Sequence, residues 1–303
     1  MTDRVGIAMA LMIGFCITAP ILDVCAKLAA AEIPVGQITA ARFLVQAALM
    51  IPMVWIAGQP LRLPPNTLGL MIARALCLLA ATYCFIAAIR VMPIADALAI
   101  AFVEPFIILL MGYLVFRDAI GPRRILACAV GFTGALLVIQ PSLAVFGPVA
   151  FYPLGTAVTF AAYMILTRGL APKIGPLPMQ AQTAIIASAI CLPILYFGNG
   201  TGVLDIDPVM PQGIFWVWLL GVGVAAAGSH LMMTYALSMA PASTLAPLHY
   251  LEIVTAVAFG YLIFGDFPNW LTWIGIGVIV SSGLYIIFRE RQQARLAAMS
   301  AAR

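Results

Sequence analysis

EPFIILLMGYLVFRD at residues 104–118 is repeated as EIVTAVAFGYLIFGD at residues 252–266. Both copies read Glu, seven residues, and then Gly-Tyr-Leu-x-Phe-x-Asp, without a gap. A weaker match earlier in the chain places Lys27 opposite Arg168 and Pro52 opposite Pro193. Weak internal symmetry of this kind is typical of a duplicated fold. We therefore predict a first repeat over residues 1–141 and a second over residues 142–303.

The composition predicts that both repeats lie in a membrane. Of the 303 residues 64% are hydrophobic and 9% are charged, with a mean hydropathy of +1.10. A soluble domain is about half apolar and about a quarter charged. About 20 apolar residues span a bilayer as a helix, so we predict an all-α integral membrane protein with ten transmembrane helices. These spans cover residues 4–29, 34–57, 66–89, 94–116, 122–140, 148–171, 178–198, 212–238, 243–264 and 268–288.

Five spans in each repeat have a geometric consequence. After an odd number of crossings the second copy enters the membrane upside down relative to the first, so we expect two inverted five-helix repeats around a central cavity. Inverted repeats are typical of secondary transporters, which bind their substrate at the repeat interface and work by alternating access. The alternative is a duplicated scaffold without transport, as in an intramembrane enzyme or an assembly subunit.

Basic residues predict how the spans are oriented. With a cytoplasmic N-terminus, only Lys27 and Arg90 fall at outer ends of spans. The inner loops and tails then hold Arg4, Arg62, Arg117, Arg123, Arg124, Arg168, Lys173, Arg289, Arg291, Arg295 and Arg303. This is the positive-inside pattern, so we expect a multi-pass protein of the cell inner (plasma) membrane with both termini cytoplasmic. A nucleic-acid partner is not expected.

Three acidic residues lie away from the ends of predicted spans: Asp23 in the first, Glu104 in the fourth and Glu252 in the ninth. Ionised and facing lipid, they would together oppose insertion by about 8 to 10 kcal/mol. They must therefore face the bundle interior, where they could hold a proton or pair with a substrate ammonium group. Alternatively, each is a buried acid bonded to neighbouring helices or to backbone freed by proline. The expected helix breaks are at Pro20, Pro105 and Pro247.

Two histidines and several aromatic residues complete the candidate substrate site. His249 lies three residues before Glu252 on the same helix face, and Ala101 stands at its place in the first repeat. A position that differs between the repeats is where the protein could recognise an asymmetric substrate. His230 is a second candidate for this role. A histidine in a span is more often an interhelical hydrogen-bond donor. The aromatic candidates, each of which could also be ordinary packing, are Tyr83, Phe102, Tyr163, Tyr235 and Tyr250.

Other polar and small residues suggest scaffold roles. Arg42, near the outer end of the second span, could attract a carboxylate, although an anchor at the membrane interface is the favoured interpretation. Asp205 and Asp207 indicate a solvated turn. The six cysteines lie inside spans without paired spacing, and no metal or cofactor is expected. Small residues in the fifth and tenth spans are typical of close helix packing, and we expect a monomer or weak homodimer: Gly131, Gly134, Gly275, Gly277, Ser281 and Gly283.

Several stretches carry a family resemblance. Residues 42–52, the Glu104-Pro105 helix that leads into Gly112-Tyr113-Leu114, and the Gly131–Gly134 helix resemble the first EamA unit of the drug/metabolite transporter superfamily; residues 252–283 resemble the second unit. Within the superfamily the chain is most similar to the YddG-type amino-acid exporters. It departs from the family at Asp118 and Asp266, where glutamate is frequent, and at Ile253, where a proline often follows the glutamate.

The resemblance implies a secondary transporter that exports amino acids, aromatic and other neutral ones, or related small metabolites. It also implies that the aromatic candidates lie on helices around the cavity. The alternative is a carrier for another small metabolite, such as a nucleobase, nucleoside or drug. An intramembrane enzyme is less favoured because the sequence has no Gly-x-Ser-x-Gly, His-Glu-x-x-His or Walker A motif. A channel is less favoured because proline-broken helices in an inverted repeat suit a carrier.

Overall fold

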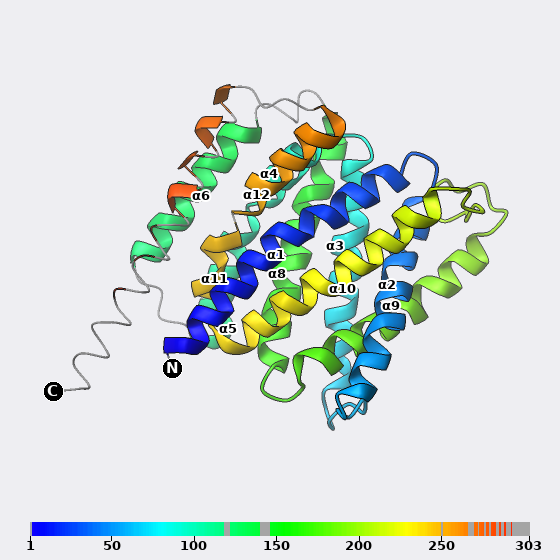
Figure 1. Cartoon of the computed structure of the whole chain (residues 1–303), viewed down its shortest axis with the longest axis horizontal. Coiled ribbons are helices and arrows are strands. Elements are labelled where there is room, and N and C mark those ends of the chain that lie inside the picture. The colour runs from blue at the N-terminus through cyan, green and yellow to red at the C-terminus, as the bar shows by residue number, and fades with distance from the viewer. Residues whose placement is uncertain are drawn as a thin grey trace.

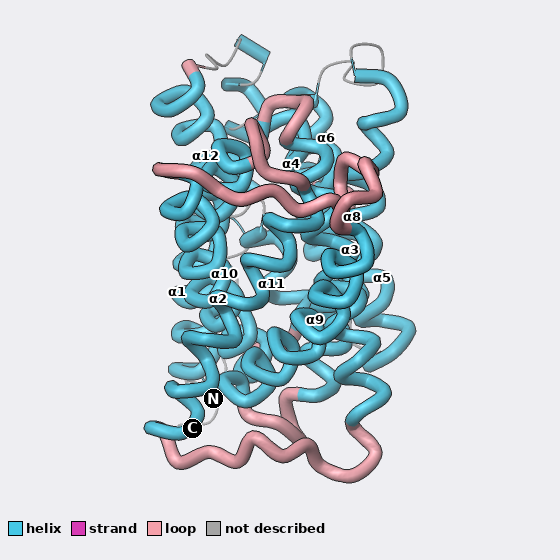
Figure 2. The backbone as a smooth tube through the Cα atoms, turned by 90° about the vertical axis from the view of Figure 1, so that its right-hand side faces the viewer, coloured by secondary structure: helices cyan, strands magenta, loops and turns pink. Residues whose placement is uncertain are grey.

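The computed structural model describes residues 2–117, 122–139, 146–249 and 251–265, together with parts of the segment 270–292. The described elements are helical: α1 (Thr2–Ala29), α2 (Val35–Ile56), α3 (Leu68–Ile89), α4 (Ile94–Ala101), α5 (Glu104–Phe116), α6 (Pro122–Ile139), a 3-10 turn η1 (Gly147–Ala150), α8 (Phe151–Leu170), α9 (Pro176–Gly198), α10 (Phe215–Met239), α11 (Ala242–His249), α12 (Glu252–Phe259) and a π-helical turn η2 (Gly260–Phe264). Figure 2 shows them side by side as a bundle.

Seven segments of the described residues are long and apolar enough to cross a membrane, which agrees with seven of the predicted spans. Shorter apolar helices at Ile125–Gly134, Glu252–Phe264 and Trp273–Ser282 fall within the other three, so the count of ten stays a prediction. Large apolar side chains cover the outside of the bundle; Ile56, Tyr196 and Phe197 are 86%, 79% and 77% exposed. Apolar helices with such surfaces form a multi-pass membrane protein.

Each of the first three helices packs against a helix from the second half of the chain. α1 lies along α10, α2 along α9, and α3 along α8. Figure 1 shows α1 and α10 running side by side. Gly223 lets α10 approach α2 closely, because a Cβ atom at this position would overlap Val45. The central helices therefore interleave the two halves of the sequence rather than forming two separate bundles.

Two helices are interrupted at equivalent places in the two halves of the chain. Only the first break lies next to a proline, as predicted. α4 ends at Ala101 and α5 begins at Glu104, with Pro105 in the first turn of α5, where a missing N–H is tolerated. In the second half α11 ends at His249 and α12 begins at Glu252. The break predicted at Pro247 is wrong in position, because α11 continues through Pro247 to His249.

The break predicted at Pro20 is also wrong, since α1 is continuous from Thr2 to Ala29. Proline lacks the N–H that would bond to the carbonyl four residues earlier, which here is the carbonyl of Cys16. The Thr255 hydroxyl of α12 donates a hydrogen bond to that oxygen. A neighbouring helix thus satisfies the freed backbone group, which is how prolines are tolerated within transmembrane helices.

Candidate functional site

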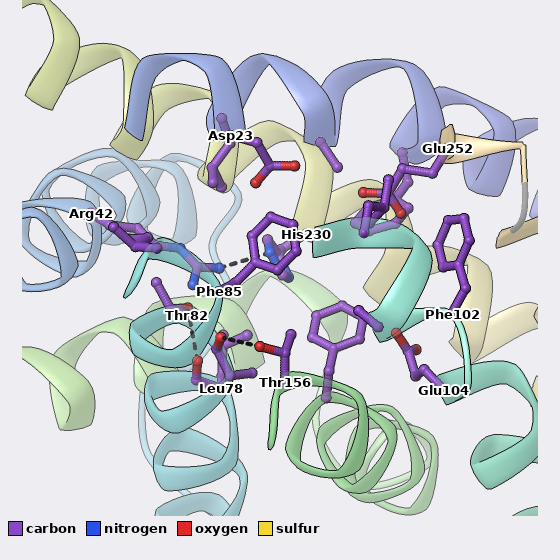
Figure 3. Close-up of a pocket in the computed structure, with 18 residues that line it drawn as sticks. Asp23, Arg42, Leu78, Thr82, Phe85, Phe102, Glu104, Thr156, His230 and Glu252 are labelled. Atoms are coloured by element: carbon purple, nitrogen blue, oxygen red, sulfur yellow. Dashed lines mark hydrogen bonds between the residues drawn. The ribbon is translucent and has the colours of Figure 1, made fainter. Parts of the chain in front are cut away.

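A cavity of about 90 Å³ lies among α1, α2, α3, α4, α5, α8, α10 and α12. Its lining is mostly aliphatic and aromatic, with Phe15, Phe85 and Phe160 from three helices and Phe102 from the break between α4 and α5. Thr82 and Thr156 add hydroxyl groups, and five ionisable side chains complete the lining: Asp23, Arg42, Glu104, His230 and Glu252. Figure 3 shows these charged groups converging from separate helices. An apolar pocket with a few convergent polar groups is the usual form of a small-molecule site.

Arg42 presents its guanidinium to one end of this cavity. The side chain is 2% exposed, so its interpretation as an interface anchor is wrong. Arg42 Nη2 lies 2.7 Å from His230 Nε2, and the guanidinium carbon stacks over Phe43 at 4.8 Å. Arg42 Nε is buried and has no hydrogen-bond partner within the described part of the chain. A buried guanidinium with an unused donor favours binding of an anionic group.

Asp23 lies on α1 and faces the same space (Figure 3). Asp23 is 6% exposed, and the described residues supply its carboxyl group with neither a hydrogen bond nor an ion pair, Arg42 included. A buried unpaired carboxyl group is costly unless a partner compensates it. One end of the cavity therefore offers a cationic and an acidic group that do not neutralise one another by direct contact.

The two helix breaks bring Glu104, Glu252 and His249 together at the other end. Glu104 Oε1 lies 3.3 Å from His249 Nδ1, and Glu252 Oε2 lies 3.5 Å from His249 Nε2. The imidazole thus lies between two carboxyl groups, one from each half of the chain. Phe160 stacks on the imidazole with ring centroids 5.9 Å apart, and Phe15 approaches it at 5.1 Å. Glu104 and Glu252 line the cavity, while His249 lies behind them.

A second buried cation, Arg74, was missed in the sequence. It is fully buried and donates hydrogen bonds to Thr167, Thr183 and the Tyr163 hydroxyl, over whose ring it also stacks at 4.5 Å. Gln180 donates to the same hydroxyl at 3.1 Å. The burial of Arg74 could have been predicted from the sequence. A charged side chain inside the third span is costly in lipid and must face the bundle interior, as for the acidic residues.

Most of the predicted aromatic candidates do not line the cavity. Phe102 lines the cavity, whereas Tyr83, Tyr163 and Tyr235 are not among its lining residues. Tyr163 is instead held by Arg74 and Gln180, and Tyr83 donates a hydrogen bond to Asp205. Tyr250 lies outside the described residues. The phenylalanines at positions 15, 85 and 160, which do line the cavity, carried no polar group that would have distinguished them from packing.

Asp205 lies in a turn and is partly exposed, as the sequence suggested, and its side chain is also bonded to residues in and at the end of α3. Its carboxylate forms an ion pair with Arg90 at 3.0 Å and accepts a hydrogen bond from the Tyr83 hydroxyl at 3.1 Å. Its carbonyl oxygen accepts a hydrogen bond from Gly36 N at 2.9 Å. Asp207 fits the expected turn, since it accepts bonds from Gly200 N and Gly202 N. The connection between α9 and α10 is thereby tied to α2 and α3.

Comparison with known proteins identifies relatives of the whole chain. The model of the EamA-like transporter family matches residues 6–140 and again residues 147–289. A riboflavin transporter of Rhizobium johnstonii is 28% identical over 211 residues, which cover 70% of this chain and 67% of that protein. An S-adenosylmethionine uptake transporter of Rickettsia prowazekii is 23% identical over 278 residues, covering 91% and 90% of the two chains.

Two further comparisons extend over nearly the full length. The pseudopaline exporter CntI of Pseudomonas aeruginosa is 25% identical over 290 residues, covering 95% of this chain and 97% of the exporter. A solved crystal structure superposes with a TM-score of 0.75 at 17% identity, covering 94% of this chain and 98% of the other. The latter similarity shows a shared fold. The named relatives carry chemically different molecules in both directions, so they do not single out amino acids or export.

Proposed function

Because the chain belongs to the EamA-like transporter family, and is thus a multi-pass small-molecule transporter, we propose that it is a secondary carrier for amino acids or related amphoteric metabolites. The observation that carries the proposal is that one cavity is lined by both Arg42, whose Nε has no partner among the described residues, and Asp23, a buried carboxyl group that does not contact Arg42 directly. An amino acid has a carboxylate for the first and an ammonium group for the second. No single apolar or singly charged solute complements both.

The free-energy cost of desolvating buried polar groups determines which solutes the cavity favours. A buried charge or polar group without a partner is costly, and a substrate that supplies the partner recovers that cost on binding. An analogue that lacks the carboxylate or the ammonium group leaves one protein group unpaired, which is the situation that gives large discrimination. The phenylalanine-rich remainder of the lining suits an aromatic or other apolar side chain.

We propose that transport proceeds by alternating access between repeats at residues 1–141 and 142–303, with export as the physiological direction and both termini in the cytoplasm. The interleaved helix pairs α1–α10 and α3–α8 support this, because a two-fold axis between inverted repeats exchanges one pair with the other. A cavity of about 90 Å³ is smaller than the roughly 300 Å³ at the lower end of ligand sites. Substrate entry therefore requires the halves to separate on one side.

A second candidate is a carrier of a planar heterocyclic metabolite, such as a nucleoside or flavin. The specific observation in its favour is the set of four phenylalanines in the lining, since aromatic rings bind planar ring systems by stacking. Relatives named as riboflavin and S-adenosylmethionine transporters support the same alternative. The two candidates differ in their dependence on Arg42 and Asp23.

The test is counterflow in proteoliposomes loaded with a single unlabelled amino acid, nucleoside or riboflavin and supplied outside with the labelled form. We expect saturable counterflow of amino acids that is lost in Arg42→Gln and Asp23→Asn and kept in Arg62→Gln, an exposed position between α2 and α3. Counterflow of nucleosides or riboflavin alone, unaffected by Arg42→Gln and Asp23→Asn, would establish the second candidate and reject the first.

A further inference from the structure

We propose that Glu104, His249 and Glu252 form a proton-binding site that couples this carrier to a proton gradient. The site is distinct from the Arg42–Asp23 end of the cavity, to which substrate binding is assigned above. The inference rests on the proposed function and names the ion that drives it. The cluster lies at two helix breaks, and two of its three members line the cavity.

The three groups are close enough to share protons and are almost enclosed by protein. His249 Nδ1 is 3.3 Å from Glu104 Oε1, and His249 Nε2 is 3.5 Å from Glu252 Oε2. The three residues are only 1%, 4% and 6% exposed, in the order His249, Glu104, Glu252. Among the described residues, both ring nitrogens and Glu104 Oε1 are buried without an aligned hydrogen bond. A fully satisfied structural brace would align these atoms, whereas a site that exchanges protons has to change its bonding during the cycle.

Helix termini make the site favourable for charge. Glu104 and Glu252 are the first residues of α5 and α12, and His249 is the last residue of α11. The amino end of a helix stabilises negative charge and the carboxyl end stabilises positive charge. The breaks thus place each ionisable group at the helix end that favours its charged form, although the cluster lies away from bulk water. Both the charged and the neutral forms become accessible, as proton transfer requires.

Charge counting gives the number of protons involved. With both carboxyl groups ionised and the imidazole neutral, the cluster carries two negative charges; one bound proton leaves one, and two make it neutral. An enclosed apolar environment favours the neutral cluster. When the cavity opens to water, hydration favours the singly negative form, and one carboxyl O–H bond breaks as its proton passes to water. One proton is therefore exchanged in each cycle.

Water that enters the cavity can reach the cluster. Glu104 and Glu252 are lining residues, whereas His249 is behind them against Phe15 and Phe160. The carboxyl groups come from opposite halves of the chain, so separation of the halves changes both distances to His249. Substrate binding and proton binding are thereby linked to the same movement.

Titratable groups of three neighbouring helices, α1, α10 and α2, lie near the cluster. From α1, Cys16 Sγ lies against the backbone of Leu248 and interacts electrostatically with Glu252 and Glu104, and Asp23 interacts with Glu252. From α10, His230 interacts electrostatically with His249, and the ring of Phe160 contacts both imidazoles. Arg42 of α2 is paired with His230. Cys16 therefore offers a matched control: its replacement disturbs packing at the cluster and leaves the three titrating groups in place.

The experiment uses the full-length chain in liposomes with labelled phenylalanine, the membrane potential being clamped with potassium and valinomycin. With one proton exchanged for each zwitterion, accumulation at equilibrium should change about tenfold for each unit of pH difference, since 1.4 kcal/mol corresponds to tenfold. We expect His249→Gln, Glu104→Gln and Glu252→Gln each to abolish this dependence, while counterflow without a gradient persists in His249→Gln, whose side chain is not among those lining the cavity. Cys16→Ala should retain both.

The outcomes separate the two proposals. Counterflow of phenylalanine in the wild-type chain without any response to the pH gradient overturns the proton site and leaves the carrier proposal intact. A full response that survives in His249→Gln also overturns it. If no amino acid in the panel shows counterflow, the carrier proposal fails. The proton site is then judged by infrared carboxyl signals between acid and alkaline buffer, which should shift in His249→Gln but not in Cys16→Ala; an unchanged signal in His249→Gln rejects the site.

Discussion

Arg42 Nη2 lies 2.7 Å from His230 Nε2, which joins α2 of the first half to α10 of the second half. A guanidinium only donates hydrogen bonds, so Nε2 must be the acceptor and the ring proton must be on Nδ1. Nδ1 faces the Tyr163 hydroxyl at 3.4 Å. The contact therefore orients the Arg42 guanidinium at the cavity and links it, through His230 and Tyr163, to the second buried cation, Arg74.

Replacement of Arg42 should affect substrate binding more than stability. Arg42→Lys keeps the positive charge and loses the planar fork that binds a carboxylate at two points. Hydrogen bonds to charged groups contribute about 1.5 to 3 kcal/mol, so KM for amino-acid counterflow should rise about ten- to a hundredfold. Kinetics in proteoliposomes measure this, with Arg62→Lys as the control. An unchanged KM would remove Arg42 from the substrate site.

Arg74 should behave in the opposite way. Its partners Thr167, Thr183 and Tyr163 belong to α8 and α9, and the side chain is not among those lining the cavity. Arg74→Gln leaves several buried acceptors without a donor and should lower the free energy of unfolding by about 2 to 4 kcal/mol. Thermal unfolding in detergent measures the loss. A large change in KM with unchanged stability would contradict a structural role.

Thr255 should be energetically coupled to Pro20, because its hydroxyl bonds to the Cys16 carbonyl that Pro20 leaves free. Thr255→Val should destabilise the chain by about 1 to 3 kcal/mol, the cost of a buried group left without a partner. In the Pro20→Ala background the new backbone N–H bonds to Cys16, so the same substitution should cost much less. The control is Thr133→Val, since Thr133 is exposed and its hydroxyl donates to the Ala129 carbonyl of its own helix. Equal losses with and without Pro20 would refute the coupling.

Gly36 should hold the connection between α9 and α10 in place. A Cβ at Gly36 would overlap the Asp205 carbonyl oxygen, to which Gly36 N now bonds at 2.9 Å. Gly36→Ala should displace the connection and increase access to the cavity from that side. The measurement is the labelling rate of Ala81→Cys, a cavity position, with a membrane-impermeant maleimide.

Gly69→Ala is the control for this prediction, because a Cβ at Gly69 meets nothing within 4 Å. We expect severalfold faster labelling in Gly36→Ala than in the Gly69→Ala control, with the chain without Ala81→Cys as the background. Equal rates in both variants would show that this connection does not close the cavity.

Much of the architecture was predictable from the sequence. Seven long apolar helices lie where the hydropathy predicted spans, and Asp23, Glu104 and Glu252 are buried, as the cost of charge in lipid requires. The break before Glu104 follows from Pro105. The break before Glu252 has no proline at the equivalent place, and only the repeat of the glutamate itself pointed to it.

The sequence alone determined that this chain is a helical membrane protein with acidic groups inside, because the free energy of inserting apolar and charged residues depends mainly on composition along each span. The tertiary structure decided which side chains meet: that Arg42 faces the cavity, that Tyr163 turns to Arg74, and that His249 lies between two glutamates. The physical reason is that lipid-facing and protein-facing surfaces of a transmembrane helix are almost equally apolar. Hydropathy therefore carries little information about which face of a helix points inward, and only the packing of all the helices settles it.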